Sequence, residues 1–335
     1  MVSDLLRILN QEYDISATAV KPFGPVWQVF STKDHYALKR TGATAGRLIK
    51  TAKMLVQIEQ AGFLSVISPE MSKMKLPFFE FDNHYYQLFQ WRHGSHPSFK
   101  GSEPIQKCAR LFARLHRISR LTSNLEDCKV TDLIANLEQK TAFIENTILC
   151  LKNRPRLNRI DRGLIRWGEY YLTQARHSLS GFKNTSESLS PSGITGFCHN
   201  DPAPRNIIVE NGQSFLLDFE LSTTGLLVTE IAKLTSRVLQ ANDWSPPIFD
   251  LVINAYNQER PITHWEKKIL PYLLCFPQHF WRFCSQRFDE KLKWSERRFA
   301  ARLWEITNLE GQRLAFLKTI MPEFQCDFNS ITVGG

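Results

Sequence analysis

The 335-residue sequence lacks the features of a membrane-spanning chain. No hydrophobic run approaches the ~20 residues that cross a bilayer, and the mean hydropathy is slightly negative at -0.28. The first residues, Met1–Arg7, do not combine a basic segment with an apolar one. We therefore expect neither a signal peptide nor a membrane span.

The cysteines form no metal-binding or disulfide pattern. There are 7 of them, an odd number, and no two have the C-x-x-C spacing. This disfavours both a structural zinc site and a framework of paired disulfides. We expect buried free thiols in a reducing compartment.

Acidic residues are fewer than basic ones, 33 against 42, which gives a formal net charge of +9. Many basic residues lie three or four positions apart, as Arg110, Arg114 and Arg117 do, and this spacing is typical of a solvated helix face. An anionic substrate or an anionic assembly surface would also use the charge. No nucleic-acid-binding motif accompanies it, so we expect no nucleic-acid partner.

The most informative stretch lies between residues 198 and 220. His199, Asp201 and Asn206 have the H-x-D-x-x-x-x-N spacing of a kinase catalytic loop, and Asp218 follows at the end of an apolar run. Asp201 would orient or deprotonate an acceptor hydroxyl. Asn206 and Asp218 would supply hard oxygen ligands to Mg²⁺.

The residues between these motifs predict a β-hairpin. A β-branched run, an Asn-Gly pair and a second apolar run follow one another over residues 206–217. Such a hairpin would bring Asn206 and Asp218 to one metal ion. His199 and Glu220 are candidate supporting residues. The alternative is that the polar residues of this proline-rich loop only cap turns.

The segment CHNDPAPRNIIVENGQSFLLDFE resembles the aminoglycoside phosphotransferase and choline kinase branch of the protein-kinase-like fold. The resemblance implies ATP and Mg²⁺ as cofactors, Asp201 as the catalytic residue, and Asn206 and Asp218 as metal ligands. Two positions depart from the family pattern: Asn200 replaces a usual Gly, and Glu230 replaces a usual Asp.

The same resemblance implies an α+β, bilobal architecture. Residues 1–91 would form a small N-lobe with an antiparallel sheet and one helix that cover the nucleotide. Residues 92–325 would form a large, mainly helical C-lobe with the catalytic loop, the metal site and the acceptor-side helices.

Candidate nucleotide-binding residues lie in the N-lobe. Lys39 ends a short apolar strand as the lysine of V-A-I-K does, and it would contact the α- and β-phosphates. The alternative is a surface lysine at a strand end. Glu59 is the only acid of the helix predicted over Thr44–Gly62, so it is the candidate ion-pair partner of Lys39. The loop over residues 22–25, with one Gly and two Pro, is a degenerate phosphate cradle.

Two further segments are assigned roles from the resemblance. A strand over residues 84–91 would lead into the hinge, where backbone groups would meet adenine; these residues are Leu88, Phe89, Gln90 and Trp91. LFARLH, in a helix predicted over Ser102–Arg120, resembles the L-A-x-L-H helix of the family. His116, its last residue, would buttress the catalytic loop rather than act as a catalyst.

The N-terminal pattern narrows the resemblance. VWQVFSTKDHYALKRT, a helix ending in QAGF, and HYYQLFQWRHG resemble the CotS-type spore coat proteins of endospore-forming Bacillus-like bacteria, which include the YsxE and YutH groups. The resemblance covers roughly residues 15–320. It implies a protein of sporulation, made in the mother-cell cytoplasm, located in the spore coat, with other coat proteins as partners.

Two hypotheses follow. The chain is a Mg-ATP phosphotransferase acting on a hydroxyl or amine of a small molecule or coat protein, which the intact Asp201, Asn206 and Asp218 favour. Alternatively, it is a weak or inactive kinase-like protein that serves coat assembly. The degenerate loop over residues 22–25 and the late position of Glu59 favour this second hypothesis. A shared fold does not decide between them.

Overall fold

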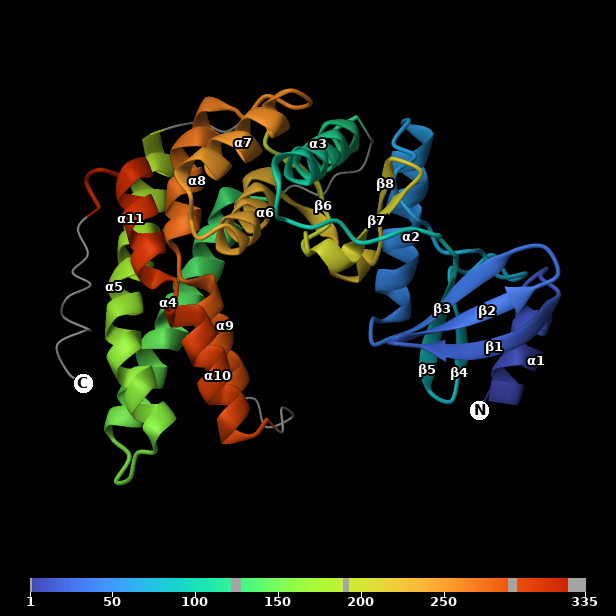
Figure 1. Ribbon diagram of the computed structural model, residues 1–335, viewed down its shortest axis with the longest axis horizontal. Helices are drawn as coiled ribbons and strands as arrows, with labels where there is room; N and C mark the ends of the chain where they lie inside the picture. The colour runs from blue at the N-terminus through green and yellow to red at the C-terminus, as the bar shows by residue number, and fades with distance from the viewer. Residues whose placement is uncertain (1, 122–127, 189–192, 289–293, 325–335) are drawn as a thin grey trace. The chain divides into compact units, whose positions relative to one another are not determined.

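The computed structural model describes residues 2–121, 128–188, 193–288 and 294–324 (Figure 1). The chain divides into two compact units, each made of three separate segments. The first unit comprises Met1–Ser98, Arg110–Leu125 and Gly196–Thr224. The second comprises Phe99–Ala109, Glu126–Thr195 and Gly225–Gly335. The first unit thus contains residues 1–91 and also Gly196–Thr224, the segment with the predicted catalytic residue and metal ligands. A domain boundary after residue 91 stays a prediction.

The first unit is built on a five-stranded antiparallel sheet with the strand order β1-β2-β3-β5-β4. Its strands are Ala17–Phe23 (β1), Val26–Ser31 (β2), His35–Thr41 (β3), Phe79–Phe81 (β4) and His84–Gln90 (β5). The register of β3 and β5 pairs Lys39 with Gln87 and Thr41 with Tyr85. Because alternate residues of a strand share a face, Lys39 and Thr41 project to the same side of β3.

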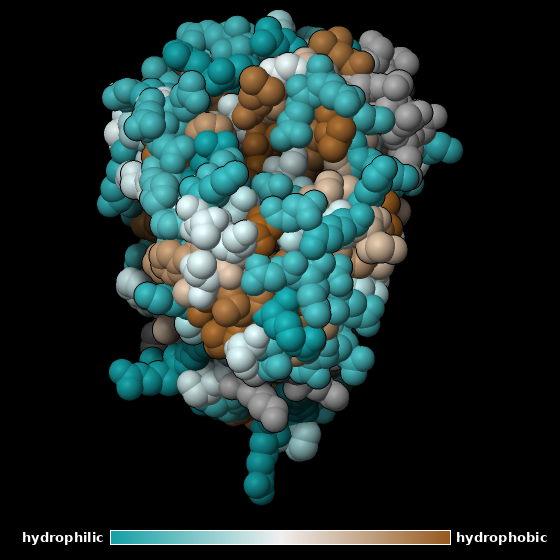
Figure 2. All heavy atoms as spheres, turned by 90° about the vertical axis from the view of Figure 1, so that its right-hand side faces the viewer, coloured by the Kyte–Doolittle hydropathy of each residue, from teal (hydrophilic) through white to brown (hydrophobic). Residues whose placement is uncertain are grey.

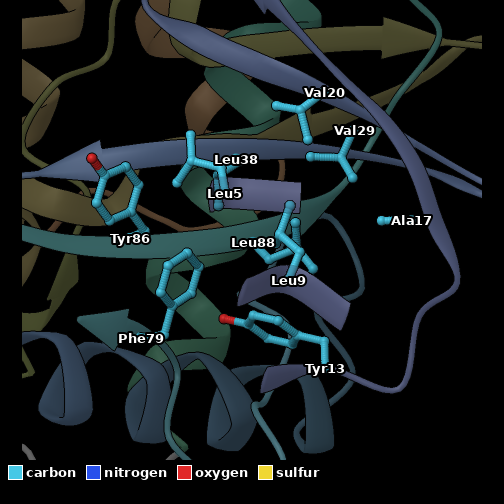
Figure 3. Packing of buried hydrophobic residues seen from close by; sticks show 10 residues of the cluster. All are labelled: Leu5, Leu9, Tyr13, Ala17, Val20, Val29, Leu38, Phe79, Tyr86 and Leu88. Carbon is cyan, nitrogen blue, oxygen red and sulfur yellow. The ribbon is translucent and has the colours of Figure 1, made fainter. Parts of the chain in front are cut away.

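Helix α1 (Val2–Glu12) packs its apolar side on this sheet. Leu5 and Leu9 lie one turn apart, so they share a face, and both are fully buried. They join a core of strand residues and aromatic rings, drawn in Figure 3. Phe79 and Tyr86 stack in this core with ring centroids 5.3 Å apart. The core holds β3, and therefore Lys39, in a fixed register.

Helix α2 (Ala45–Gln60) follows β3, as expected, and buries an apolar stripe that includes Leu48, Ala52, Leu55 and Ile58. The chain that follows α2 forms backbone hydrogen bonds with the hairpin predicted over residues 206–217. The Leu216 amide donates to the Ser65 carbonyl at 2.8 Å, and the Ile67 amide donates to the Leu216 carbonyl at 3.2 Å. These bonds link the N-terminal segment directly to the strand that ends beside Asp218.

The hairpin predicted between the two motifs is confirmed. Strands β7 (Ile207–Glu210) and β8 (Gln213–Leu216) pair antiparallel. Asn211 and Gly212 form the turn with φ angles of 49° and 79°, as the left-handed positions of a type I′ turn require. Strand β6 (Thr195–Cys198) precedes the hairpin in the chain and pairs with β9 (Thr223–Leu226), which follows the hairpin.

The segment that leaves β5 runs along this hairpin. The Ser95 amide donates to the Val209 carbonyl at 3.2 Å, and the Val209 amide donates back to the Ser95 carbonyl at 2.9 Å. A Cβ atom at Gly94 would lie 2.4 Å from the Val209 carbonyl oxygen, so only glycine permits this approach. Gly94 therefore helps to fix the hairpin against the sheet.

The second unit is helical. Helix α3 (Ser102–Ser119) begins in it and ends in the first unit. The remaining helices are α4 (Val130–Lys152), α5 (Arg159–Ser188), α6 (Leu227–Ala241), α7 (Pro246–Asn257), α8 (His264–Cys275), α9 (Gln278–Arg287), α10 (Glu296–Thr307) and α11 (Glu310–Ile320). Helix α5 packs against α4 and α8, and α9 packs against α4 and α10.

A polar network is buried in the helical unit. The Glu310 carboxylate accepts hydrogen bonds from Tyr170, Tyr171, Gln174 and Arg313. A buried carboxylate with this many donors is satisfied, which accounts for a charged residue inside the unit. Among the described helices, none is long and apolar enough to span a membrane. The face seen in Figure 2 is mostly hydrophilic, with small separate hydrophobic areas.

Candidate active site

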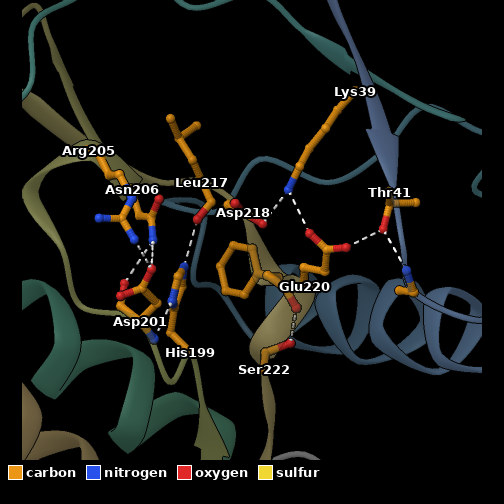
Figure 4. Close-up of polar contacts among 12 residues, drawn as sticks. Lys39, Thr41, His199, Asp201, Arg205, Asn206, Leu217, Asp218, Glu220 and Ser222 are labelled. Atoms are coloured by element: carbon orange, nitrogen blue, oxygen red, sulfur yellow. Dashed lines mark hydrogen bonds and ion pairs between the residues drawn. The ribbon is translucent and has the colours of Figure 1, made fainter. Parts of the chain in front are cut away.

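Asp201 and Asn206 lie together in the loop between β6 and β7. The Asn206 amide nitrogen donates to the Asp201 backbone carbonyl at 3.0 Å and to its Oδ2 atom at 2.9 Å. Both partners are oxygens, so the nitrogen must face Asp201, and the Asn206 Oδ1 atom points the other way (Figure 4). An amide oxygen in this orientation is a suitable ligand for a hard cation.

Arg205 is a site residue that sequence analysis missed. Its guanidinium lies 2.6 Å from the Asp201 Oδ2 atom, while the Arg205 side chain is 68% exposed and that of Asp201 only 13%. The arginine therefore covers the carboxylate and balances its charge. The only signal in the sequence was a basic residue four positions after an acidic one, which is common in loops.

His199 joins the catalytic loop to the segment that carries Asp218. Its Nε2 atom lies 2.6 Å from the Leu217 carbonyl oxygen, and its Nδ1 atom lies 3.3 Å from the Asp201 backbone nitrogen. A carbonyl can only accept and an amide N–H can only donate, so the neutral Nε2–H tautomer satisfies both contacts. The fully buried ring packs against Phe219 with centroids 4.7 Å apart. The structure thus gives His199 a positioning role.

The backbone at Asp218 is in the left-handed region, with φ 59° and ψ 67°. Few residues other than glycine adopt this conformation, although Asp and Asn do so more readily than most. The Leu217 amide donates to the Asn206 carbonyl at 2.8 Å and closes the base of the hairpin. The tight turn at Asp218 then sends its carboxylate to the side on which Asn206 Oδ1 lies (Figure 4).

Asn200 adopts the same left-handed conformation, with φ 69°. This explains the departure from the glycine of the family pattern, because Asn tolerates positive φ. Its side-chain amide also donates to the Leu221 carbonyl at 3.2 Å. The substitution thus leaves the course of the loop intact.

Lys39 lies against the carboxylates of Asp218 and Glu220. Its Nζ atom is 2.6 Å from Asp218 Oδ1 and 2.9 Å from Glu220 Oε2. Glu220 is held in turn by a short hydrogen bond from the Thr41 hydroxyl, which also accepts the Ala43 amide at 3.0 Å. Sequence analysis missed Thr41, although the two-residue spacing from Lys39 on one strand face was a signal.

The protonation states of Lys39 and Glu220 follow from this arrangement. Burial lowers the pKa of Lys39, but the hydrogen bonds and negative charges of Asp218 and Glu220 outweigh it, so the pKa is raised. Burial raises the pKa of Glu220, but the hydrogen bonds of Thr41 and Lys39 and the charge of Lys39 outweigh it, so the pKa is lowered. Both groups are charged at neutral pH.

The structure corrects the predicted Lys39–Glu59 ion pair. The Glu59 carboxylate accepts a hydrogen bond from the Ser68 hydroxyl at 3.0 Å, near the C-terminal end of α2. Lys39 instead contacts Glu220, which lies two residues beyond Asp218 and therefore reaches the same ammonium. The acidic partner of Lys39 therefore lies in the segment that follows β8 and not in helix α2.

Two backbone groups of the predicted adenine-binding segment have partners within the protein. The Leu88 carbonyl accepts the Glu70 amide at 2.7 Å, and the Trp91 amide donates to the His35 carbonyl at 2.9 Å. Phe89 and Gln90 pair with Ala37 and Tyr36 in the sheet. Adenine contacts of Leu88–Trp91 stay a prediction, and they would use other groups than these two.

His116 is fully buried near the end of α3. Its carbonyl accepts the Ser119 hydroxyl at 3.1 Å, and the Ser119 oxygen accepts the Phe197 amide at 3.0 Å. Since Phe197 belongs to β6, this chain of bonds connects the end of α3 to the strand that enters the catalytic loop. A buttressing role of the His116 side chain stays a prediction.

The donor set at Asn206 and Asp218 fits a divalent metal ion. An amide oxygen and a carboxylate are the ligands that Mg²⁺ and Ca²⁺ prefer. The Asp218 carboxylate already attracts one cation, the Lys39 ammonium. The sequence-predicted residues Lys39, Asp201, Asn206, Asp218, His199 and Glu220 are thus brought together, and Glu59 is not.

The fold is similar to that of several solved structures of phosphotransferases and kinases. An aminoglycoside phosphotransferase from Alicyclobacillus acidocaldarius matches with a TM-score of 0.80 and 19% identity, over 95% of each chain. A spectinomycin phosphotransferase, solved with ADP and spectinomycin, matches with a TM-score of 0.67 and 11% identity, over 94% of this chain and 98% of that one. A choline kinase from Streptococcus pneumoniae matches with a TM-score of 0.57 and 14% identity, over 93% and 98%.

These identities show the fold, which is the α+β, kinase-like fold of aminoglycoside phosphotransferases and choline kinases, with an antiparallel sheet and a mostly helical remainder. A family model described as the phosphotransferase enzyme family matches residues 25–267, which include every residue of the site above. On this match, the chain belongs to the phosphotransferase enzyme family.

Proposed function

We propose that this protein transfers the γ-phosphoryl group of Mg-ATP to a hydroxyl or amine of a small molecule or a coat component. The convergence of Lys39, Asp201, Asn206 and Asp218 carries the proposal. Phosphoryl transfer needs a positioned nucleophile and neutralised phosphates, and it needs little covalent chemistry from the protein. A base, two hard oxygen ligands and a lysine supply these requirements.

Each residue has a separable role. The Asp201 carboxylate orients the acceptor group and accepts its proton. Asn206 and Asp218 would hold Mg²⁺, which neutralises charge on the phosphates when it is bound. The Lys39 ammonium, which contacts Asp218 and Glu220 here, would contact the phosphates of a bound nucleotide in place of Asp218 and keep its ion pair with Glu220. His199 fixes the distance between the acceptor side and the metal side of the site.

Nucleotides are present in structures of the same fold. The spectinomycin phosphotransferase was solved with ADP, and an amicoumacin kinase was solved with AMP-PNP and Ca²⁺. The amicoumacin kinase has 14% identity to this chain and a TM-score of 0.62. These complexes support a nucleotide and a divalent cation as ligands here, and we propose Mg²⁺ as the cation.

We further propose a CotS-type role in the spore coat, after synthesis in the mother-cell cytoplasm. The N-terminal segments over residues 26–41 and 84–94, which resemble that family, support this proposal. A fluorescent fusion in a sporulating Bacillus host should gather around the forespore and remain on the released spore. A signal that stays diffuse through spore maturation would contradict the location.

The second candidate is a coat-assembly protein without catalysis. The phosphate-covering turn favours it, since Gly24 is the only glycine between two prolines at the end of β1 and the start of β2. Such a turn offers fewer backbone N–H groups than a glycine-rich loop.

The variant Asp201→Ala separates the two candidates. For a phosphotransferase, wild-type protein incubated with Mg-ATP and a library of hydroxyl- and amine-bearing acceptors should form ADP in an acceptor-dependent way. Asp201→Ala should lose at least about 100-fold of this rate, which is the usual effect of a general base, and should keep Mg-ATP binding. An equal rate in the variant would refute the assignment of Asp201.

A further inference from the structure

The sheet of the first unit has two unlike faces. Val29, Leu38 and Leu88 are fully buried on the face that packs against α1 (Figure 3). Lys39 projects from the opposite face, because neighbouring residues of a strand point to opposite sides. Ala37 shares this opposite face with Lys39 and is only partly buried. The core of the unit therefore leaves the face beside Lys39, which we call the second face, incompletely covered.

Two aromatic rings meet across the second face. Phe23, the last residue of β1, and Trp91, which follows β5, lie edge to face with their ring centroids 5.2 Å apart. Strands β2 and β3 lie between β1 and β5 in the sheet, so this contact spans two strands. Phe23 is 58% exposed, and Trp91 is half-buried. The pair therefore leaves aromatic surface with which a third ring can make contact.

The register of the strands places Phe23 on the same face as Lys39. Residues directly opposite each other in an antiparallel pair share a face. Phe23 lies opposite Val26 in the pair of β1 and β2. Gln28 shares a face with Val26 and lies opposite Ala37 of β3. Phe23, Ala37 and Lys39 thus lie on one face of one sheet, and the aromatic pair adjoins the candidate phosphate site.

Backbone groups at the end of β5 are engaged within the first unit. The Leu88 carbonyl and the Trp91 amide bond other backbone groups at 2.7 Å and 2.9 Å. The His93 amide donates to the Glu210 carboxylate at 2.5 Å. A site that recognises a ligand by hydrogen bonds discriminates strongly against analogues that lack them. Since these three groups already have partners, they do not read the hydrogen-bonding edge of a base.

Aromatic stacking, in contrast, tolerates a change of base. Every base has a π face, and stacking on an aromatic side chain stabilises each of them. A purine has two fused rings, so it covers more of a Trp or Phe ring than a pyrimidine does. A base between Trp91 and Phe23 would have its phosphates toward Lys39 and Asp218, which contact each other at 2.6 Å. All four residues belong to the first unit.

We propose that Trp91 and Phe23 bind the base of the phosphoryl donor by stacking, and that the site accepts guanine nucleotides as well as adenine nucleotides. The base would replace the edge-to-face contact between the two rings, so that both rings contact it. The inference rests on the proposed function, since it takes a nucleoside triphosphate as the donor.

The test is isothermal titration calorimetry of the whole protein with Mg-ATP, Mg-GTP, Mg-CTP and Mg-tripolyphosphate. The dissociation constants for Mg-ATP and Mg-GTP should agree within about fivefold, and that for Mg-CTP should be at least about tenfold higher. Tripolyphosphate has no base and reports on the phosphate side alone. A constant for Mg-GTP more than about 100-fold above that for Mg-ATP would overturn the inference and leave ATP binding in place.

Variants locate the base. Trp91→Leu and Phe23→Leu each remove one ring, so each should weaken binding of both purine nucleotides about tenfold and leave the tripolyphosphate constant unchanged. Trp91→Phe keeps a ring and should bind both nucleotides within about threefold of the wild type. Trp304→Leu, a change of an exposed tryptophan on α10, is the matched control and should alter none of these constants.

Two results with the variants would contradict stacking. One is unchanged Mg-ATP affinity in Trp91→Leu or in Phe23→Leu. The other is an equal loss of affinity for tripolyphosphate and for the nucleotides, since this would mean a disturbed fold and not a lost base contact. Both results leave nucleotide binding by the wild type intact. Absence of nucleotide binding by the wild type would instead refute the phosphotransferase proposal and this inference together.

Discussion

Lys39 Nζ lies 2.6 Å from Asp218 Oδ1, so the lysine assigned to the phosphates neutralises the carboxylate assigned to the metal. The two residues are far apart in sequence and meet because β3 and the base of the hairpin belong to one unit. In the proposed function, binding of Mg-ATP would replace this contact, because Asp218 would then hold the metal and Lys39 would contact the phosphates. Glu220, at 2.9 Å from the same ammonium, is the partner that Lys39 can keep throughout.

The variant Glu220→Gln should therefore weaken Mg-ATP binding. Loss of the negative charge leaves Lys39 with Asp218 as its charged partner, which then competes with the metal for that carboxylate. We expect an increase in the dissociation constant of about tenfold, equivalent to ~1.4 kcal/mol. Isothermal titration calorimetry measures it. Glu59→Gln is the control, and its dissociation constant for Mg-ATP should stay within about twofold of the wild-type value. A larger increase for Glu59→Gln than for Glu220→Gln would instead support Glu59 as the partner of Lys39.

His199→Ala should destabilise the protein and loosen the site. The variant removes two buried hydrogen bonds and leaves a cavity beside Phe219, which together cost about 3 kcal/mol. Urea unfolding measures the free energy. The exposed His264 at the start of α8 offers a control, and His264→Ala should change stability by less than about 0.5 kcal/mol. Equal effects of the two changes would refute the bridging role.

Gly94→Ala should be strongly destabilising. The added Cβ would lie 2.4 Å from the Val209 carbonyl oxygen, and backbone cannot move away without breaking the bonds between residue 95 and the hairpin. We expect a loss of about 2–4 kcal/mol in urea unfolding, with reduced Mg-ATP binding in the folded fraction. Gly46→Ala, in the first turn of α2 with open space around it, should instead stabilise by up to about 1 kcal/mol.

The stability of the protein should fall with acidification through the titration range of His279. Burial of this imidazole on α9, together with the positive charge of nearby arginines, lowers its pKa to about 4 in the folded state, whereas the ordinary pKa of a histidine is 6.5. Between pH 4 and pH 6.5 this histidine binds more protons in the unfolded chain than in the folded protein, so the free energy of unfolding rises with pH. Below pH 4 the contribution of this histidine to stability is lost. This pKa difference corresponds to a contribution of at most about 3 kcal/mol, which the partial exposure of the ring reduces.

His279→Gln should flatten that part of the profile, which urea unfolding at a series of pH values would show. His264→Gln, a change of an exposed histidine, should leave the slope as in the wild type. An unchanged slope in His279→Gln would contradict the positive, half-buried environment of this ring.

Much of the catalytic segment could be predicted from the sequence because its determinants are local. The Asn-Gly turn and the apolar runs around it predict the hairpin, and the hairpin brings Asn206 and Asp218 together. Lys39 could be placed on β3 from its apolar strand, although β3 continues to Thr41. The left-handed backbone of Asn200 is consistent with the glycine usual at that position.

Other parts depend on packing between distant segments and left no local signal. Lys39 pairs with Glu220 and not with Glu59 because of the way in which α2 and the segment after β8 pack near β3. Arg205 was missed because its exposed side chain folds back onto Asp201.

The central claim, that Asn206 and Asp218 hold the metal of a bound nucleotide, is tested most directly by a thermal-shift titration with ATP in the presence and absence of Mg²⁺. Asp218→Asn is the variant of choice, because Asn also tolerates the left-handed backbone at this position. We predict a Mg²⁺-dependent rise in melting temperature for the wild type that Asp218→Asn abolishes. No shift of the wild type at millimolar Mg-ATP, or an equal shift in the variant, would contradict the claim.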